Sequence, residues 1–512
     1  MNSNQFINNG AESGGIITIQ EYSNVTMKNV TAFNIFANFG GVASIISNCI
    51  MTIDHSQFSH CHVFETGGAL TVDSSILYMS YCTLENITAN ITGGAIFVRN
   101  NSFVSIKKCQ LYIGEAKLGG VIAAHNQSNI TIIDSTVFNT TALSGGVIAS
   151  LNSCVVFVKG SEFSHCKAMG PGGVFYSTFS SKLYIQKCKF GSNTAKSNGG
   201  IVFAAVNSSV FISNSHVKNN EAKVGGMAAL QEHSNISIIG SAIFNVTSTY
   251  FGGVVSIVDN CILNVHRSVF SSCKSLESAG VLGILESSKS YMQDSQFSNN
   301  SANFQGGIIS VGNNSLMSTE ACQFSSNEAL RGGAIHIEAQ SQAKFIDCEI
   351  SENTAADNGG VIRVIGQSKL SLQTTQFNDN WAPLGGAAHV DSGSNLTIKQ
   401  CEFIGNSAIY GGILSTATAH FIHISGSQLF RSHGGIGALY IWESELNFTG
   451  NVTFSNNIGL LYVVHSTVHF RGVVSFLENT PNKFRNSGTY YAPSEGGAIT
   501  GFRAFFYLKM QV

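Results

Sequence analysis

Pairs of glycines recur at a nearly constant spacing through most of this 512-residue chain. Most successive doublets are 26 or 27 residues apart, the last step is 23, and one slot is degenerate, Ala279-Gly280. The doublets begin at Gly14, Gly40, Gly67, Gly93, Gly119, Gly145, Gly172, Gly199, Gly225, Gly252, Gly306, Gly332, Gly359, Gly385, Gly411 and Gly434. A period this regular is typical of one structural unit stacked many times, so the sequence predicts a solenoid.

One bulky apolar residue also recurs in phase with the glycines, and fifteen of its nineteen occurrences are Phe. A single large apolar slot in every repeat indicates a stacked column in the core. The slots are Phe6, Phe33, Phe58, Leu84, Leu111, Phe138, Phe163, Phe190, Val217, Phe244, Phe270, Phe297, Phe324, Ile350, Phe377, Phe403, Phe430, Phe454 and Phe476.

The segments between these two markers alternate apolar and polar residues in short runs split by Asn and Ser, as in Gly93–Val98 followed by Phe103–Ile106. Two or three short strands and no helix are therefore expected in each repeat. The sequence predicts an all-β fold, a single-stranded right-handed parallel β-helix of the pectin lyase-like type with about 18 coils of 26–27 residues.

The glycine doublet is expected to lie at a corner of each coil. There the backbone needs a positive φ or a close approach to the next coil, and a Cβ would clash in every repeat. A column of Asn follows three residues after the apolar slot in five successive repeats: Asn300, Asn327, Asn353, Asn380 and Asn406. Stacked Asn side chains can hydrogen-bond along the axis of a solenoid, so this column is predicted to be a ladder.

Residues 1–479 are predicted to form the β-helix repeats, beginning within a truncated coil. The pattern breaks after Gly434, with Gly459 as a weak slot, and residues 480–495 are expected to form an inserted loop. Residues 496–512 are predicted to form the start of a further, truncated coil. The missing polar caps and signal peptide lead us to expect that the chain is a fragment of a longer extracellular or cell-surface protein.

Six of the twelve cysteines form pairs with a spacing of 12 residues. In a flattened coil the two members of a pair could face each other across a corner and close a disulfide. The candidate pairs are Cys49 with Cys61, Cys154 with Cys166, and Cys261 with Cys273. The alternative interpretation is that all six are small buried apolar residues repeated by duplication.

The charge pattern argues against several classes of function. Only 11% of residues are charged and the net charge is −2, so there is no electrostatic case for binding nucleic acid. No apolar run is long enough to span a membrane. Acids lie one per coil, at Asp54, Asp134, Asp294 and Asp347, and no Asp-Asp pair occurs.

Arg363 is interpreted as a lone base on a strand, so it and these acids are expected to be wall residues facing solvent. Two groups resemble metal sites, namely Asp54-His55 with His60-Cys61-His62, and His420 with His423 and His433. We favour the interpretation that neither group binds a metal ion, and we predict no catalytic residue and no cofactor.

Sequons for N-glycosylation are frequent and agree with a secreted surface. They begin at Asn24, Asn29, Asn86, Asn90, Asn126, Asn129, Asn139, Asn207, Asn235, Asn245, Asn395, Asn447 and Asn451.

The combination of Gly-Gly-Ala-Ile/Leu with Phe-x-x-Asn resembles the repeats of chlamydial polymorphic outer membrane proteins and similar repeats of large eukaryotic surface proteins. The first motif occurs at Gly67–Leu70, Gly93–Ile96, Gly332–Ile335 and Gly496–Ile499. The second occurs at Phe190–Asn193, Phe297–Asn300, Phe324–Asn327, Phe377–Asn380 and Phe403–Asn406. The resemblance implies a β-helical surface protein that takes part in adhesion.

The first functional hypothesis is therefore a non-enzymatic extracellular or cell-surface scaffold or adhesion rod. A polysaccharide lyase- or hydrolase-like enzyme and a glycan-binding module are the alternatives. Expected partners are surface glycans or extracellular proteins, with no nucleic acid and no membrane span in this chain. Converging Asp, Arg and Lys side chains would favour the enzyme, whereas exposed aromatic side chains would favour glycan binding.

Overall fold

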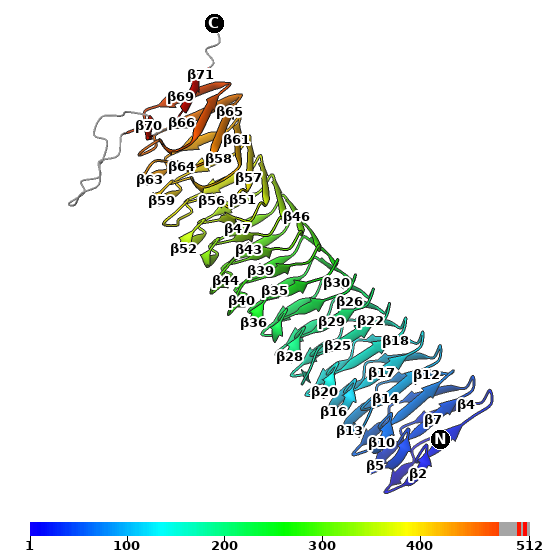
Figure 1. Cartoon of the computed structure of the whole chain (residues 1–512). Helices are drawn as coiled ribbons and strands as arrows, with labels where there is room; N and C mark the ends of the chain where they lie inside the picture. Colours follow the sequence, from blue (N-terminus) through cyan, green and yellow to red (C-terminus); the bar gives the residue numbers. More distant parts are fainter. Residues whose placement is uncertain (481–498, 503–504, 509–512) are drawn as a thin grey trace. The chain divides into compact units, whose positions relative to one another are not determined.

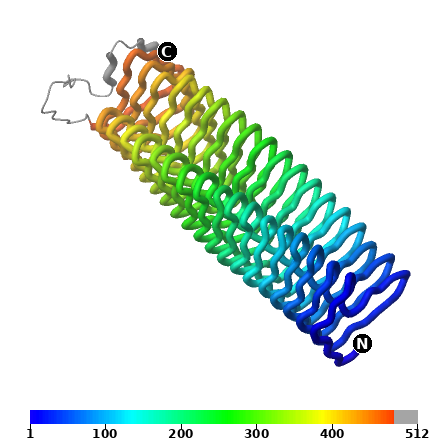
Figure 2. The backbone as a smooth tube through the Cα atoms, turned by 60° about the horizontal axis from the view of Figure 1, so that its bottom comes forward, coloured from blue at the N-terminus to red at the C-terminus, as the bar shows by residue number. Residues whose placement is uncertain are grey.

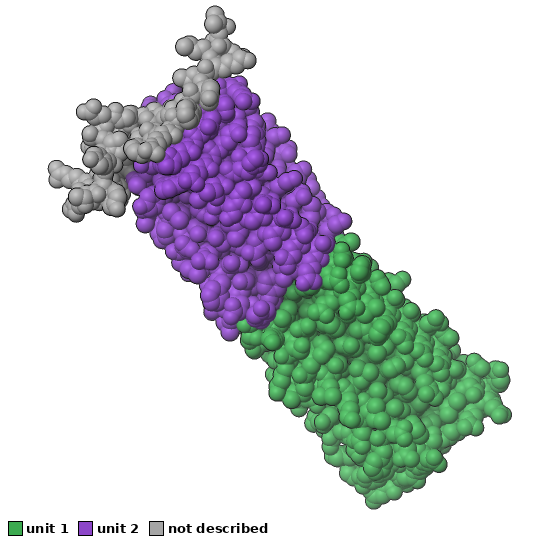
Figure 3. Space-filling model, viewed as in Figure 1, with its two compact units in different colours: residues 1–249, 254–263 green, residues 250–253, 264–512 purple. Residues whose placement is uncertain are grey.

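The computed structural model describes residues 1–480, 499–502 and 505–508. The chain forms two compact units, unit 1 (residues 1–249 and 254–263) and unit 2 (residues 250–253 and 264–512) (Figure 3). Both are built of short parallel strands, and no helix occurs among the described residues (Figure 1). The fold is an all-β parallel solenoid of about 18 turns, which confirms the predicted fold class.

Each coil contributes strands to three parallel sheets, which we call A, B and C. In unit 2 one coil runs from β45 (Ile309–Val311) in sheet C to β46 (Leu316–Glu320) in sheet A. It continues through β47 (Gln323–Ser325) and β48 (Glu328–Arg331), both in sheet B. Unit 1 repeats this order in β22 (Val155–Lys159, sheet A), β23 (Glu162–Ser164) and β24 (Lys167–Ala168), both in sheet B, and β25 (Phe175–Thr178, sheet C).

Most coils therefore have four strands and some have three, whereas the sequence pattern predicted two or three. The difference arises because some turns consist of a single residue with positive φ, such as Ala321 (φ 50) and Ser326 (φ 55). A one-residue turn hardly interrupts the alternation of side chains, so it leaves little signal in the sequence.

Successive coils pair in register through backbone hydrogen bonds. Figure 2 shows the coils stacked on one another within each unit. Ile309 of β45 pairs with Ile335 of β49 (Ile335–Ile337), for example. Since pairing is parallel and in register, every side chain stacks on the residue at the same position one coil later.

The two glycines of a doublet have different roles at the corner that precedes sheet C. The first needs a positive φ, as in Gly332 with φ +61. A Cβ on the second, Gly333, would overlap the carbonyl oxygens of Gly360 and Thr354 in the next coil. Both reasons predicted for the doublet are thus confirmed, each for one of the glycines.

The last doublet, Gly434, does not mark a corner. It lies inside β63 (His433–Ile436), and the glycine with positive φ is Gly437 (φ +68), which is 26 residues after Gly411. The 26-residue period therefore continues to Gly437, three residues beyond the predicted break, and the pattern changes only after it. A shorter coil follows, which ends at Gly459 (φ +68).

The apolar column fills the core, but four of its predicted members are displaced by one residue. Phe297 and Phe324 are fully buried and stack with ring centroids 5.1 Å apart. In contrast, Phe33, Phe138 and Phe244 are 42%, 39% and 42% exposed, and Phe430 is only half-buried. The strand register places Ala32, Val137, Ile243 and Leu429 in the column instead. A shift of one residue along a strand turns the side chain to the opposite face.

The Asn column forms the predicted ladder. The Asn327 side chain is fully buried, and its Nδ2 donates to the carbonyl oxygens of Phe297 (3.1 Å) and Ser325 (2.9 Å) and to Oδ1 of Asn353 (2.8 Å). Its Oδ1 accepts from the backbone N–H of Asn300 at 3.0 Å. The Asn ladder thus provides hydrogen-bond partners for backbone N–H and C=O groups at the turn between β47 and β48 of sheet B.

The inserted loop predicted for residues 480–495 lies outside the described residues, apart from Thr480. Two strands in the predicted further coil (496–512) are described, β70 (Ile499–Phe502) and β71 (Phe505–Leu508). They pair with β67 (Leu461–Val464) of sheet C and β68 (Thr467–Phe470) of sheet A. Within the described ranges, no helix is long and apolar enough to cross a membrane.

Candidate functional site

Sheet C of unit 2 carries an unusual row of side chains on the face that points away from the core. In β49, Ile335 and Ile337 are fully buried core residues, so the residue between them, His336, points to the other face. Strand register aligns it with residues of β53 (Ile362–Val364), β56 (Ala388–Asp391), β60 (Leu414–Ala417), β64 (Leu439–Trp442) and β67. The row, which we call the sheet C column, is His336, Arg363, His389, Ser415, Tyr440 and Tyr462.

The first part of the column is a cluster of charged and polar groups. His336 Nε2 lies 3.1 Å from Glu338 Oε2, and Arg331 Nε lies 2.8 Å from Asp357 Oδ2. Arg363, between the two histidines, has no ion-pair partner among the described residues, and its buried Nε has no hydrogen-bond partner. A guanidinium without a protein partner is available to bind a polar ligand.

Burial sets the protonation of this cluster. It lowers the pKa of His389 to about 4, against a smaller opposing effect of Asp391. The pKa of His336 is also lowered by burial, although the hydrogen bond with Glu338 opposes the shift. Both imidazoles are therefore neutral at neutral pH, and Arg363 carries the positive charge of the column.

This burial predicts a pH dependence of stability. The pKa of His389 is about 4 in the folded state against 6.5 in the unfolded chain, so between these values the unfolded chain binds more protons. The free energy of unfolding should therefore fall as pH decreases from about 6.5 to 4, with a contribution from His389 of about 3 kcal/mol. Urea unfolding of the wild type and His389→Gln across this range measures it. The variant should lose less stability, and equal losses would contradict the assignment.

The second part of the sheet C column, Tyr440 and Tyr462, belongs to an aromatic cluster. Two neighbours complete the cluster, namely Tyr410 at the end of β59 (Ser407–Tyr410) and Trp442. Tyr440 stacks on Tyr462 with centroids 5.5 Å apart, meets Tyr410 edge-on at 5.4 Å, and lies 6.4 Å from Trp442. Trp442 is 40% and Tyr410 36% exposed. Burial raises the pKa of the central Tyr440 to about 12. The cluster is thus a packed aromatic surface open to solvent at its edges.

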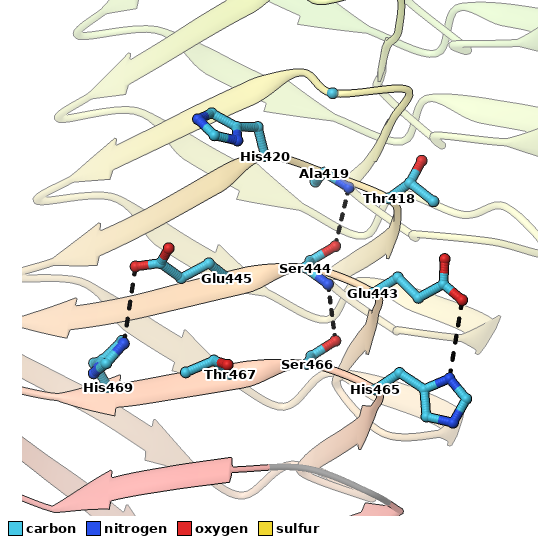
Figure 4. A pocket seen from close by; sticks show the side chains of 11 residues that line it. Thr418, Ala419, His420, Glu443, Ser444, Glu445, His465, Ser466, Thr467 and His469 are labelled. Atoms are coloured by element: carbon cyan, nitrogen blue, oxygen red, sulfur yellow. Dashed lines mark hydrogen bonds and ion pairs between the residues drawn. The ribbon is translucent and has the colours of Figure 1, made fainter.

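A separate hollow of about 460 Å³ lies where the last coils turn from sheet C into sheet A (Figure 4). His465 Nδ1 lies 3.9 Å from Glu443 Oε1, and His469 Nε2 lies 3.9 Å from Glu445 Oε1. Figure 4 shows these pairs on opposite sides, with Ser466 and Thr467 between them. The two acid–base pairs therefore do not converge on one point.

The first metal-like group of the sequence is spread over two turns. Asp54 Oδ1 contacts His55 Nδ1 at 2.9 Å and accepts from Ser80 Oγ at 2.8 Å, and these hydrogen bonds lower its pKa. His62 Nδ1 instead lies 2.7 Å from Thr88 Oγ1. Cys61 is buried.

The second metal-like group is also dispersed. His420 lines the hollow of Figure 4, His423 Nε2 lies 3.1 Å from Thr449 Oγ1, and His433 begins β63. In the part of the chain that is described, no three His, Cys, Asp or Glu side chains are placed to hold a metal ion.

All twelve cysteines are buried and have free thiols in the structure, including those of the three candidate disulfide pairs. Cys49 lies at the corner before β8 (Ile50–Asp54), whereas Cys61 lies between β9 (Gln57–Ser59) and β10 (His62–Thr66). The same separation applies to Cys154 and Cys166, and to Cys261 and Cys273. The two thiols of each pair thus occupy different corners of one coil, with two strands between them.

Of the acids expected to face solvent, Asp134, Asp294 and Asp347 are exposed, whereas Asp54, the last residue of β8, is half-buried. Asp54 is near Lys28, and Asp347 accepts a hydrogen bond from Thr374 Oγ1. Arg363 differs from the prediction, because it is half-buried between two histidines rather than alone and facing solvent. The signal was present in the sequence, since His336, Arg363 and His389 each follow the first glycine of a doublet by four residues.

The asparagines of the predicted sequons differ from one another in their exposure to solvent. Asn447 is only 3% exposed, and its Nδ2 donates to Glu445 Oε1 at 2.8 Å, so it cannot carry a glycan in the folded chain. The other twelve asparagines named above as sequons are exposed or half-buried.

A comparison with models of known protein families agrees with this fold. A family model described as "right handed beta helix region" matches residues 306–475. Among solved structures, the chain is similar to a PL6 family alginate lyase, AlyGC, with 10% identity and a TM-score of 0.20, covering 99% of this chain and 97% of the lyase. A mutant of the same lyase gives 10% identity and a TM-score of 0.18, with coverage of 97% and 98%. No curated protein matches. The class of protein that emerges is a right-handed parallel β-helix, as the repeat pattern predicted.

Proposed function

We propose that this protein is a non-enzymatic extracellular or cell-surface adhesion protein that binds glycans through the sheet C column of unit 2. The observation that carries the proposal is that the aromatic cluster and the half-buried, unpaired Arg363 lie in the same column, with His389 and Ser415 between them. The repeats that resemble those of chlamydial surface proteins support an adhesive role. Exposed sequons in both units support a secreted location.

The chemistry of the column suits a sugar polymer. A sugar ring has an apolar C–H face, which packs on an aromatic ring, and hydroxyl groups that need hydrogen-bond partners at its rim. Tyr440 and Trp442 provide the first kind of surface, and Arg363 provides donors for the second. Successive positions are one coil apart, so the distance between the accessible ends of the column, Arg363 and Tyr462, is about 19 Å. A surface of this length favours an extended glycan over a single sugar.

Catalysis receives less support from the same geometry. A neutral imidazole beside an arginine is an arrangement that proton abstraction could use. However, the His336 side chain is 0% and His389 only 5% exposed, so a bound polymer would not reach either of them. Arg363 and the aromatic cluster are the accessible groups, which favours binding over cleavage.

A glycan array combined with a depolymerisation assay on the purified chain tests the proposal. We expect saturable binding to extended glycans and no release of oligosaccharides. Oligosaccharide release from a bound polysaccharide would instead establish the enzymatic alternative. Absence of binding to every glycan would refute the proposed function.

Replacing Tyr440 with alanine should weaken binding of the preferred glycan by about tenfold or more, because it removes the centre of the aromatic cluster. Isothermal titration calorimetry measures the affinity. Tyr291→Ala is the matched control, since Tyr291 is 43% exposed on β42 (Lys289–Gln293) of sheet A in the same unit. Equal affinities of Tyr440→Ala and the control variant would place the binding surface elsewhere.

A further inference from the structure

A ladder of small polar residues follows the turn between sheet A and sheet B. At this position the backbone N–H of each residue donates to the side chain at the same position one coil later. Val30 donates to Ser56 Oγ, Ser135 to Ser161 Oγ and Cys188 to Ser215 Oγ, each at 3.1 Å. In unit 1 the ladder contains Ser56, Cys82, Cys109, Ser135, Ser161, Cys188, Ser215 and Ser241.

Two cysteines occupy adjacent positions of this ladder in unit 1. The residues that follow Cys82 and Cys109, Thr83 and Gln110, are register partners of adjacent coils. The backbone N–H of Cys82 donates to Cys109 Sγ at 3.4 Å, and each residue is 1% exposed. Neighbouring parallel strands lie about 4.8 Å apart, and disulfides join Cα atoms about 4.4–6.8 Å apart. The stacked position therefore places the two Cα atoms at a separation that a disulfide can span.

Unit 2 contains the same arrangement at Cys322 and Cys348. Gln323 pairs with Glu349, so these cysteines also stack in adjacent coils, and they are 1% and 3% exposed. The other cysteines of the ladder, Cys188 and Cys401, are followed one coil later by serines, Ser215 and Ser427. The chain thus provides two stacked pairs and two unpaired controls in one structural position.

We propose that Cys82 with Cys109, and Cys322 with Cys348, are sites of disulfide formation between adjacent coils when the chain folds in an oxidising environment. With oxidised glutathione as the oxidant, the Cys82 thiolate attacks one glutathione sulfur and forms a mixed disulfide. One glutathione thiolate leaves and takes up the proton lost by Cys82. Cys109 Sγ, after losing its own proton, then attacks Cys82 Sγ and releases the second glutathione. Two protein thiols are oxidised and one glutathione disulfide is reduced to two thiols.

The pairing differs from the one that sequence spacing predicts. Cys49 and Cys61 belong to one coil and lie at different corners, whereas Cys82 and Cys109 share a corner in successive coils. A bond between coils would join neighbouring repeats covalently, in addition to their backbone hydrogen bonds.

Peptide mapping of the full chain tests this proposal. The protein is refolded in a glutathione redox buffer, free thiols are alkylated in denaturant, and the digest is analysed by mass spectrometry. We expect cross-linked peptides that join Cys82 to Cys109 and Cys322 to Cys348, with Cys188 and Cys401 alkylated. Full alkylation of all four paired cysteines, or their linkage to other partners, would overturn the proposal.

A gain of cross-linking provides a second test that does not depend on removing a cysteine. Ser161→Cys places a thiol one coil before Cys188, so Cys188 should change from alkylated to cross-linked. Ser241→Cys is the control, because its ladder neighbours, Ser215 and Ser268, are serines, and its new thiol should remain alkylated. If the folded Ser161→Cys variant, checked by circular dichroism, leaves Cys188 alkylated, stacking in this position does not suffice for a disulfide.

Discussion

Alanine in place of Gly333 is expected to lower the free energy of unfolding by about 4 kcal/mol or more, among the largest effects of a single substitution. The added Cβ would overlap the carbonyl oxygens of Gly360 and Thr354, which belong to the backbone of the next coil. Backbone atoms held in a ladder cannot move aside as a flexible side chain would, so the coils have to separate locally.

Urea unfolding monitored by circular dichroism measures this loss of stability. Gly191→Ala is the matched control, because Gly191 lies in a strand, β27 (Lys189–Gly191), and its Cβ would only meet Lys218 Cε at 3.9 Å. That substitution should leave stability within about 1 kcal/mol of the wild type. A Gly333→Ala variant as stable as Gly191→Ala would show that the corner is not the close contact described here.

Asn327→Leu should also lower the free energy of unfolding by about 4 kcal/mol, because the substitution disrupts the Asn ladder at a fully buried position. The substitution removes the donors to the carbonyl oxygens of Phe297 and Ser325 and the acceptor for the Asn300 backbone N–H. Each buried group left without a partner costs about 1–3 kcal/mol, and leucine cannot replace any of these bonds.

The same unfolding assay, with Asn235→Ala as the control, measures this effect. Asn235 is an exposed residue at the start of β34 (Asn235–Ile239), so its replacement should change stability by less than about 0.5 kcal/mol. If Asn327→Leu were as mild as the control, the Asn column would be a feature of composition rather than a support of the coil.

The repeating columns were predictable from the sequence because stacking imposes one residue type on one position in every coil. The position of a single residue within a strand was less predictable. Phe33 and Ala32 are neighbours, and only the strand register shows that the smaller one enters the core. Likewise, Gly434 satisfies the doublet pattern, but the positive φ belongs to Gly437.

The candidate site was missed for a different reason. His336, Arg363 and His389 are 26 or 27 residues apart, so no local motif joins them, and each is unremarkable within its own repeat. Parallel stacking brings them together, and the aromatic cluster follows in the same column. Comparing each position across repeats, in addition to the positions of the glycines, is what reveals such a site.

The fluorescence of Trp442 tests the proposed binding surface most directly. The chain contains two tryptophans, so a Trp381→Phe variant leaves Trp442 as the single reporter, at the edge of the aromatic cluster. Titration with the preferred glycan should change its emission saturably, with the same Kd as calorimetry gives. Calorimetric binding of that glycan without any change in Trp442 emission would contradict the assignment of the sheet C column as the binding surface.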